Sequence, residues 1–300
     1  MRFCDYGKQK NHIIRFGANQ ATVCLEIKKG ATEAKHHLVA QRGEDNTSVK
    51  KNQPLGPLPA VYFGPSDNNL FNRGPQERRG FLDSACGTLK KKYRQNLTDY
   101  QRIVRQKNDI LKKGAPNKVL LETFNHQLVG QSAAIIKERL EFLEQIKAPA
   151  NEIYNRLTGK PAPTEIIYKS KTDTQNITAS LNEQLRNRAN LELISGCCLV
   201  GPHRDDLLFL INGTDVAEFG SQGEKKTACL ALKIAQLKIL QENDLKPLLI
   251  LDDALSELDM GRRQLLLELV PECEQTFISA TDDIGLKLGE DVKKFKLGQQ

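Results

Sequence analysis

The chain has 300 residues, of which 39% are hydrophobic and 27% are charged, and its formal net charge is +7 at pH 7. This balance is ordinary for a globular protein that can bury a core, and the length predicts one large domain or two modest ones. No run of about 18 apolar residues occurs, which argues against a membrane-spanning helix, and the polar first residues lack the apolar centre of a secretory signal.

The N-terminal part of the chain, residues 13–63, is predicted to form strands. Thr22 to Ile27 alternates roughly between apolar and polar side chains, and Ala60 to Phe63 is a short β-like run. Gly-Pro pairs at 56–57 and 64–65 fit the turns between such strands.

From about residue 75 to residue 158 the apolar side chains recur at steps of three and four, which predicts helices. A break at 114–117 separates two long stretches, and the second ends at Gly159 and Pro161, as helix terminators should. Unbroken, the second stretch would be a rod on the order of 55 Å long. We expect Pro149 to kink or divide it. These helices would form a lobe that projects from the β-rich part.

After the lobe, residues 160–179 are polar and predict strand and loop. Ser180 to Glu183 fits a capping box that opens a helix to about Ile194. Two apolar runs, Cys197 to Val200 and Leu207 to Ile211, predict strands, and Asn212-Gly213 is typical of a tight hairpin turn.

The last third of the chain alternates between helix and strand. We expect a helix from about Ser221 to Gln241, a buried strand from Leu248 to Leu251, a helix after Met260 and a strand from Gln275 to Ser279. Apolar strands separated by helices indicate an α/β fold with a mostly parallel sheet that helices cover.

Seven cysteines without a C-x-x-C pair argue against a disulfide framework and against a structural zinc site. Cys197 and Cys198 lie in an apolar run and are expected to be buried thiols. The predicted compartment is therefore a reducing cytoplasm. His203, Asp205 and Asp206 could bind a metal, but a salt-bridged turn is the better interpretation of this cluster.

Two adjacent acids, Asp252 and Asp253, close the predicted strand of "LLILDD". In parallel α/β sheets ligands bind at the carboxyl ends of strands. Asp252 could hold Mg²⁺, which prefers carboxylate oxygens, and Asp253 could orient or deprotonate a water. The alternative is a helix N-cap, which would explain one aspartate but not two, followed by Ser256-Glu257-Leu258-Asp259.

A second motif, Ser221-Gln222-Gly223-Glu224, opens the predicted helix 28 residues before Asp252. Ser221 can cap the helix, and Gly223 would let a phosphate approach the backbone amides at the positive end of the helix dipole. Alone this motif indicates only a helix start. Its order and spacing relative to the acidic strand favour a nucleotide site.

Together these motifs resemble ABC-type ATPases of the chromosome-maintenance class, and their details resemble the RecF family. The resemblance lies in "GPHRDDLLFLING", "FGSQGEKKTACLALKIA", "LLILDDALSELD" and "FISATD", and in "GPSDNNLFNRGPQERRGFLD" upstream. It implies an α/β fold: an ABC-type ATPase head with a mixed sheet and a truncated N-terminal part, plus an inserted helical lobe. The implied divisions are a β-rich remnant of the first ATPase lobe (1–75), the helical lobe (76–195) and a C-terminal ATPase subdomain (196–300).

The resemblance also implies a role for each motif residue in an ATP-dependent dimer. Asp252 would be the Mg²⁺-associated acid and Asp253 the catalytic carboxylate. The signature segment would grip the γ-phosphate of ATP held by a partner subunit; it consists of Ser221, Gln222, Gly223 and Glu224. Ser256 and Asp259 would lie in the loop that crosses the dimer interface, and Thr281 would be the sensor.

A local basic segment, residues 77–113, contains 11 Lys/Arg and 4 Asp/Glu and so carries the whole net charge of +7. Such a surface suggests a polyanionic partner, although a solvated helix face is the simpler alternative. With the resemblance, we expect DNA as the partner. The candidate phosphate contacts are Arg78, Arg79, Lys90, Lys91, Lys92 and Arg94.

The phosphate loop G-x-x-x-x-G-K-[ST] occurs nowhere in the 300 residues. The resemblance places it before "IIRFGANQATVCLEI", which only 12 residues precede here. We therefore hold two hypotheses. In the first, this is a RecF-type protein from an incomplete gene or late start, with ATP and Mg²⁺ as cofactors and slow DNA-stimulated ATP hydrolysis. It would bind DNA at gaps and single/double-strand junctions and act with RecR, RecO and RecA. In the second, it is a shortened DNA- or RecR-binding protein that does not hydrolyse ATP.

Overall fold

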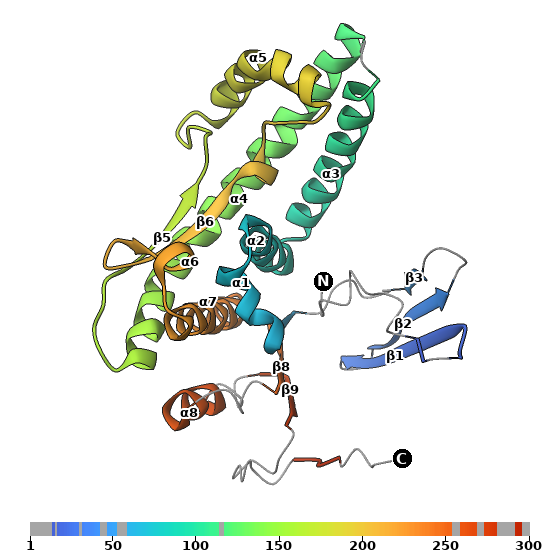
Figure 1. Ribbon diagram of the computed structural model, residues 1–300. Coiled ribbons are helices and arrows are strands. Elements are labelled where there is room, and N and C mark those ends of the chain that lie inside the picture. Colours follow the sequence, from blue (N-terminus) through green and yellow to red (C-terminus); the bar gives the residue numbers. More distant parts are fainter. Residues whose placement is uncertain are drawn as a thin grey trace.

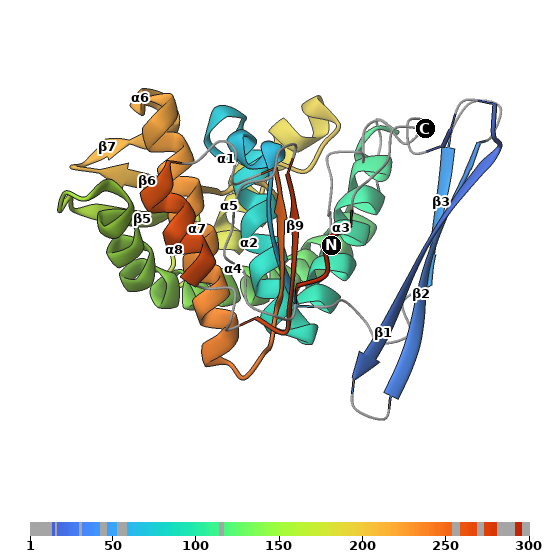
Figure 2. The same ribbon diagram turned by 90° about the horizontal axis from the view of Figure 1, so that it is seen from below.

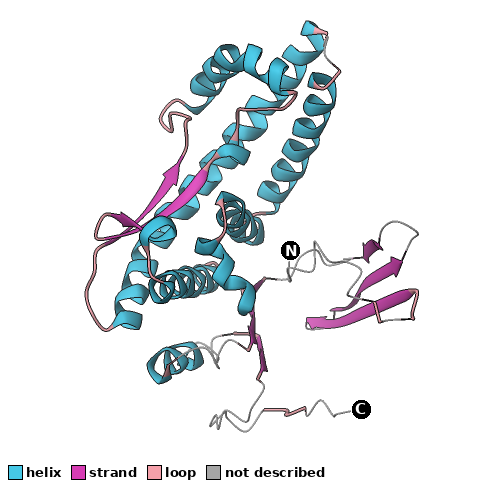
Figure 3. Ribbon diagram, viewed as in Figure 1, coloured by secondary structure: helices cyan, strands magenta, loops and turns pink. Residues whose placement is uncertain are grey.

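The computed structural model describes residues 14–15, 17–29, 32–42, 47–52, 59–113, 117–253, 259–268, 273–280 and 292–295. Helices and strands alternate over the second half of the described chain, and long helices dominate the middle (Figure 3). Among the described residues no helix is long and apolar enough to cross a bilayer. The described cysteines are all free thiols, as expected, and Cys198 is buried whereas Cys197 is partly exposed.

The N-terminal strands form an antiparallel sheet in the order β1-β2-β3. Its members are β1 (Gln20–Lys29), β2 (Thr32–Arg42) and β3 (Thr47–Asn52). Both views show this sheet to one side of the remaining ribbon (Figures 1 and 2). The strand prediction for this region is confirmed.

The functionally important sheet is parallel and has the order β4-β8-β9. Its members are β4 (Ala60–Phe63), β8 (Leu248–Asp252) and β9 (Gln275–Ser279). Leu249 and Leu251 on β8 are fully buried, as is expected of a central strand with both neighbours in place. The prediction of an apolar parallel sheet is confirmed.

A third, antiparallel sheet has the order β5-β6-β7. It consists of β5 (Thr164–Lys169), β6 (Asp206–Ile211) and β7 (Thr214–Asp215). Asn212 and Gly213 adopt positive φ angles of 49° and 77° between β6 and β7. Two consecutive left-handed residues are what a tight hairpin turn needs, so the Asn-Gly prediction is confirmed.

Four long helices form the lobe and its connection: α2 (Pro75–Leu89), α3 (Lys91–Leu111), α4 (Lys118–Thr158) and α5 (Ile177–Ser195). Figure 1 shows α5 and the adjoining ends of α3 and α4 projecting away from β8 and β9. The helix α7 (Gln222–Glu242) packs against α4, and α8 (Met260–Glu268) follows β8. The remaining short elements are η3 (Pro65–Asn68), α1 (Asn69–Asn72), η4 (Pro202–Arg204) and α6 (Val216–Phe219).

Of the two effects expected of Pro149, a kink or a division of the helix, the division does not occur in α4. The helix runs for 41 residues, which corresponds to about 60 Å. Proline removes one backbone hydrogen bond, but the fully buried Ile146, Ala150 and Ile153 hold this part of the helix by packing. Asn117 caps its start, and Gly159 ends it with a φ angle of 66°.

Three further boundaries differ from the predictions. The chain breaks at Lys90, whose extended backbone separates α2 from α3 within one continuous apolar pattern. The helix α5 begins at Ile177, and the Ser180 hydroxyl accepts a hydrogen bond from the Asp173 N–H instead of capping a helix. Cys197 to Val200 is not a strand, because the N–H groups of Cys198 and Leu199 donate to the side chains of Asn108 and Glu192.

The predicted division at residue 195 falls between two paired strands. Strand β5 lies before it and β6 after it, and they pair along their whole length from Thr164–Ile211 to Lys169–Asp206. The division into 1–75, 76–195 and 196–300 thus stays a prediction about sequence segments.

The helical lobe contains a fully buried ion pair between α3 and α5. The Lys107 ammonium lies 2.6 Å from a carboxylate oxygen of Glu192, and the two side chains are 1% and 4% exposed. The other carboxylate oxygen of Glu192 accepts a hydrogen bond from the Leu199 N–H at 2.7 Å. This pair ties α3, α5 and the following segment together.

We expect Lys107→Met to lower the free energy of unfolding by about 3 kcal/mol or more, because it leaves the Glu192 carboxylate buried without a cation. Adding Glu192→Gln should recover most of that loss, since glutamine still accepts from the Leu199 N–H. As a control, Arg102→Met removes the exposed Arg102–Asp99 pair and should cost less than about 1 kcal/mol. Urea denaturation measures the stability of all three variants. If Lys107→Met alone were as stable as the parent, the structural role of the Lys107–Glu192 pair would be contradicted.

Candidate nucleotide-binding site

Asp252 lies at the carboxyl end of the central strand β8, and both of its carboxylate oxygens are held from the neighbouring strands. The Tyr62 hydroxyl on β4 donates to Oδ2 at 2.8 Å. The Ser279 hydroxyl on β9 donates to Oδ1 at 2.7 Å. The side chain stays exposed to solvent, so it can receive a ligand. The structure thus places Asp252 where ligands bind in parallel sheets.

Asp253 follows directly in a left-handed conformation with a φ angle of 50°. Its N–H donates to both the backbone oxygen and the hydroxyl of Ser279, each at 3.1 Å. A non-glycine residue in this region costs on the order of 1 kcal/mol or more, and such residues cluster at functional sites. The Ser279 hydroxyl therefore links the two acids, since it donates to Asp252 and accepts from the backbone of Asp253.

These oxygens fit a magnesium ion that is shared with a phosphate ligand. Mg²⁺ is usually held by one or two carboxylates together with substrate phosphates and water. An exposed carboxylate with a fixed orientation meets that need. Among the described residues no group of three or more His, Cys, Asp and Glu side chains could cage a metal.

The signature segment lies at the start of α7, with Ser221 as the N-cap residue. The Ser221 Oγ accepts from the Glu224 N–H at 3.3 Å, and the Glu224 carboxylate accepts from the Ser221 N–H at 2.8 Å. This is the reciprocal capping box. The Ser221 hydroxyl also donates to Glu224, and these hydrogen bonds lower the pKa of the Glu224 carboxyl.

All four residues of the signature segment are exposed, although the helix that follows is mostly buried. Apart from its chain neighbours and the backbone of its own helix, a Cβ added to Gly223 would meet no atom of the described residues within 4 Å, so packing does not require glycine there. Gln222 accepts a hydrogen bond from Asn72 at 3.1 Å. The helix start is thus ordered from within and open toward solvent, as an anion site at a helix N-terminus requires.

Lys233, on α7, connects the signature helix to strand β4. Its ammonium donates to the Tyr62 carbonyl at 2.6 Å and forms an ion pair with Asp67. It also lies 5.7 Å from the ring centroid of Tyr62 and 5.6 Å from that of Phe63. Burial raises the pKa of Asp67, and the charge of Lys233 opposes that rise.

The predicted DNA contacts divide into buried and exposed side chains. Arg78 does not lie on an exposed surface, because its guanidinium is buried and binds Asp206 through two hydrogen bonds of 2.8 Å. Arg79 donates to the Asp205 carbonyl, and Arg94 donates to the Gly87 carbonyl. Lys90 forms ion pairs with Glu138 and Glu141.

Lys91 and Lys92 are exposed at the start of α3. Further along the same helix Arg105 is exposed, as are Lys112 and Lys113 just beyond its end, whereas Lys107 is buried with Glu192. The exposed basic side chains of this segment are the ones that remain available to a polyanion.

The cluster at His203 is structural. The imidazole Nδ1 contacts the Tyr100 hydroxyl, and Nε2 lies 3.1 Å from the Cys198 carbonyl oxygen. Burial lowers the pKa of His203 to about 4, so the ring is neutral near pH 7. Asp205 accepts from Tyr168 and Ser170, and Asp206 binds Arg78. The turn is salt-bridged, as expected.

Two of the predicted site residues, Ser256 and Thr281, lie outside the described residues. Asp259 is described; its carboxylate accepts from the Arg262 N–H at 3.0 Å at the start of α8 and pairs with the Arg262 side chain. The interface role of Asp259 stays a prediction.

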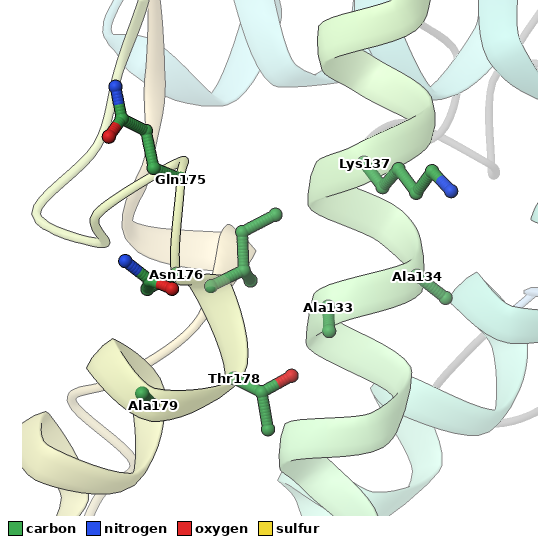
Figure 4. Close-up of a pocket in the computed structure, with 8 residues that line it drawn as sticks. Ala133, Ala134, Lys137, Gln175, Asn176, Thr178 and Ala179 are labelled. Carbon is green, nitrogen blue, oxygen red and sulfur yellow. The ribbon is translucent and has the colours of Figure 1, made fainter.

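A cavity of about 690 Å³ lies elsewhere, between α4 and the start of α5. Its lining comes from two segments, 133–137 and 175–179, and Lys137 is its only charged residue (Figure 4). None of the acid or signature residues lines it.

Sequence reasoning missed Tyr62, Ser279 and Lys233. Each lies far in sequence from the residue it holds, and a tyrosine in a short β-run predicts only a strand. Ser279 ends the strand of "FIS", and its place beside β8 could have drawn attention to its hydroxyl.

Fold and site together define an α/β nucleotide-binding head of the ABC type with an inserted helical lobe. No family model matches the chain. It is 33% identical over 311 residues to the DNA replication and repair protein RecF of Clostridium novyi (strain NT), covering 98% of this chain and 86% of that protein. Against the protein of the same name from Bacillus cytotoxicus (strain DSM 22905 / CIP 110041 / 391-98 / NVH 391-98) the identity is 34%, over 97% and 78% of the two chains. The chain belongs to the RecF family.

The solved structures agree. A structure described as the recombination mediator protein RecF-ATP in the RecFOR pathway matches with a TM-score of 0.79 and 28% identity, over 96% of this chain and 80% of that one. A second, described as RecF-ATPrS in the same pathway, matches with a TM-score of 0.77 and 29% identity over 93% and 79%. The predicted fold class and family are confirmed, and ATP is a ligand of the relatives.

We expect Ser221→Ala to raise the pKa of Glu224 toward its ordinary value, because the donors that stabilise the carboxylate are reduced. A lowered folded-state pKa contributes stability above the unfolded pKa of about 4.3 and loses it as the pH falls through the folded pKa. The variant should therefore be less stable near neutral pH, by about 1 kcal/mol, and the difference should shrink in acid. Carboxyl NMR titration and denaturation at pH 7 and pH 3 measure both effects.

Proposed function

We propose that the chain is a DNA-repair protein that binds DNA as an ATP-dependent dimer. In this proposal Asp252 holds Mg²⁺, Asp253 activates water, and the signature segment contacts the γ-phosphate of ATP on a partner subunit. The observation that carries the proposal is that two exposed features occur in the same chain. One is Asp252, whose two carboxylate oxygens are held by Tyr62 and Ser279, and the other is the signature segment, which Ser221 and Glu224 cap. The resemblance to RecF proteins extends it to gaps and single/double-strand junctions, and to RecR, RecO and RecA as partners.

The end of β8 and β9 and the start of α7 offer complementary chemistry. A carboxylate and a hydroxyl at the end of β8 and β9 provide oxygen ligands for a hard cation. The amides at the start of α7 and the helix dipole favour negative charge. A nucleoside triphosphate with its cation needs both kinds of group, and phosphoryl transfer is catalysed mainly by positioning and electrostatic stabilisation.

The openness of the signature segment supports the dimer. Among the residues that the structure describes, no neighbouring group would exclude a side chain at position 223. Because glycine has no side chain, an external phosphate can reach the backbone there. Within these 300 residues no phosphate loop accompanies the signature segment.

The alternative is a DNA- or RecR-binding protein that does not hydrolyse ATP. The missing phosphate-loop motif favours it for these 300 residues. The ordered acids, Asp252 and Asp253, favour the first proposal. Binding to DNA or RecR requires neither the two hydrogen bonds that hold the Asp252 carboxylate nor the strained backbone of Asp253. ATP binding, measured on these 300 residues beside an N-terminally extended chain that carries a phosphate loop, separates the two.

We expect these 300 residues alone to show negligible ATPase activity, with or without DNA, because a composite site requires the phosphate loop that the sequence lacks. The measurement is phosphate release against a no-protein blank and the Asp253→Asn variant. DNA-stimulated release that Asp253→Asn abolishes would contradict this expectation and place a complete site in the chain.

We expect the double variant Lys91→Ala/Lys92→Ala to bind DNA more weakly and with a shallower salt dependence. Loss of two phosphate contacts should reduce the slope of log K against log salt by about 1.8 for duplex DNA. Binding is measured by fluorescence anisotropy over a range of salt concentrations.

Two controls sharpen that measurement. Lys160→Ala/Lys171→Ala removes the same charge from exposed positions outside the basic segment and should leave the slope nearly unchanged. Lys90→Ala should have a small effect, because Glu138 and Glu141 already bind that ammonium. Equal effects of the two double variants would indicate that only net charge matters and would refute a DNA surface at the start of α3.

A further inference from the structure

We propose that Tyr62 is a positioning residue that orients the Asp252 carboxylate toward a divalent cation, and that glycine at position 64 exists to make room for the Tyr62 ring. This inference rests on the proposed role of Asp252. It adds Tyr62, which lies in none of the sequence motifs, and gives Gly64 a role beyond the turn that the sequence predicts.

The position of Tyr62 follows from strand pairing. Tyr62 pairs with Ile250 in the parallel β4–β8 ladder, two residues before Asp252. Its side chain is long enough to run along the strand direction and place the hydroxyl 2.8 Å from Oδ2 of Asp252. A phenylalanine would fill the same space without the hydrogen bond.

Gly64 provides a second, independent observation. A Cβ built at position 64 would lie 2.2 Å from the Tyr62 Oη, 2.5 Å from Cζ and 2.9 Å from Cε1. Heavy atoms of residues that are not chain neighbours essentially never lie within 3.0 Å of a real Cβ atom. Gly64 is not among the glycines with positive φ, so its backbone conformation does not demand glycine. A methyl group at position 64 would instead have to displace the Tyr62 ring.

The surrounding contacts hold the backbone that carries the Tyr62 ring, on either side of Phe63. The Tyr62 carbonyl accepts from the Lys233 ammonium at 2.6 Å, and the Gly64 N–H donates to the Asp67 carboxylate at 3.0 Å. Lys233 and Asp67 form an ion pair with each other. The turn after β4 is thus tied to the signature helix on one side while Tyr62 reaches Asp252 on the other.

The consequence for Asp252 is a fixed carboxylate plane. Tyr62 donates to one oxygen and Ser279 to the other, and each oxygen keeps a lone pair for a metal. Hydrogen-bond partners of this kind orient metal ligands, and their loss typically costs 10-fold or more in metal affinity.

The test measures Mn²⁺ binding to the full 300-residue chain by electron paramagnetic resonance, with Mn²⁺ alone as the probe. Tyr62→Phe should weaken Mn²⁺ binding by about 10-fold while circular dichroism shows an intact fold. Gly64→Ala should weaken it to a similar degree, because the added methyl displaces the ring. In a Tyr62→Leu background, Gly64→Ala should have no further effect on affinity.

Tyr168→Phe is the matched control, since Tyr168 donates at 2.6 Å to Asp205, a carboxylate outside this site, and its loss should leave Mn²⁺ affinity unchanged. If Asp252→Asn abolishes Mn²⁺ binding but Tyr62→Phe and Gly64→Ala do not change it, the positioning role is refuted and the role of Asp252 stands. If no Mn²⁺ binding depends on Asp252, the cation site itself is refuted, and the positioning role falls with it.

Discussion

The placement of β8 between β4 and β9 is the constraint on which the candidate site depends. A central parallel strand brings the carboxyl ends of both neighbours to its own end, so Tyr62 and Ser279 reach the same carboxylate from opposite sides. Neither residue is near Asp252 in the sequence. Without both strand pairings Asp252 would be an exposed acid with free rotamers, and a ligand would have to order it on binding.

The same strand end is connected to the signature helix by charge. Asp67 is largely buried, and burial alone would favour its neutral form. The Lys233 ammonium compensates for this burial by forming an ion pair with Asp67, and it also donates a hydrogen bond to the Tyr62 carbonyl. Because removal of one partner from a buried pair is costly, α7 and the turn after β4 are coupled in position. One short segment, from Tyr62 to Asn72, therefore touches both Asp252 and Gln222.

Local patterns in the sequence predicted those features that local physics determines. The strand of "LLILD", the cap that Ser221 forms at the start of α7, and the turn at Asn212-Gly213 each depend on neighbours within a few residues, and the structure confirms them. Features that depend on distant neighbours were missed or misjudged. Pro149 did not divide α4, because packing outweighs one lost hydrogen bond, and the break at Lys90 has no glycine or proline to mark it.

The net charge of residues 77–113 shows most clearly how far local sequence patterns can predict a functional surface. Counting Lys and Arg over residues 77–113 treats every cation as surface, but Arg78 and Lys107 are buried against Asp206 and Glu192. Buried cations need a paired anion, so they stabilise lobe structure and contribute nothing to an external field. Cations that serve a polyanion must stay solvated and unpaired, as Lys91 and Lys92 do among the described residues. Asp252 at the end of β8 follows the corresponding rule for anions. Among the described residues, hydrogen bonds from Tyr62 and Ser279 hold its carboxylate and no ion pair does, which leaves its charge available to a cation.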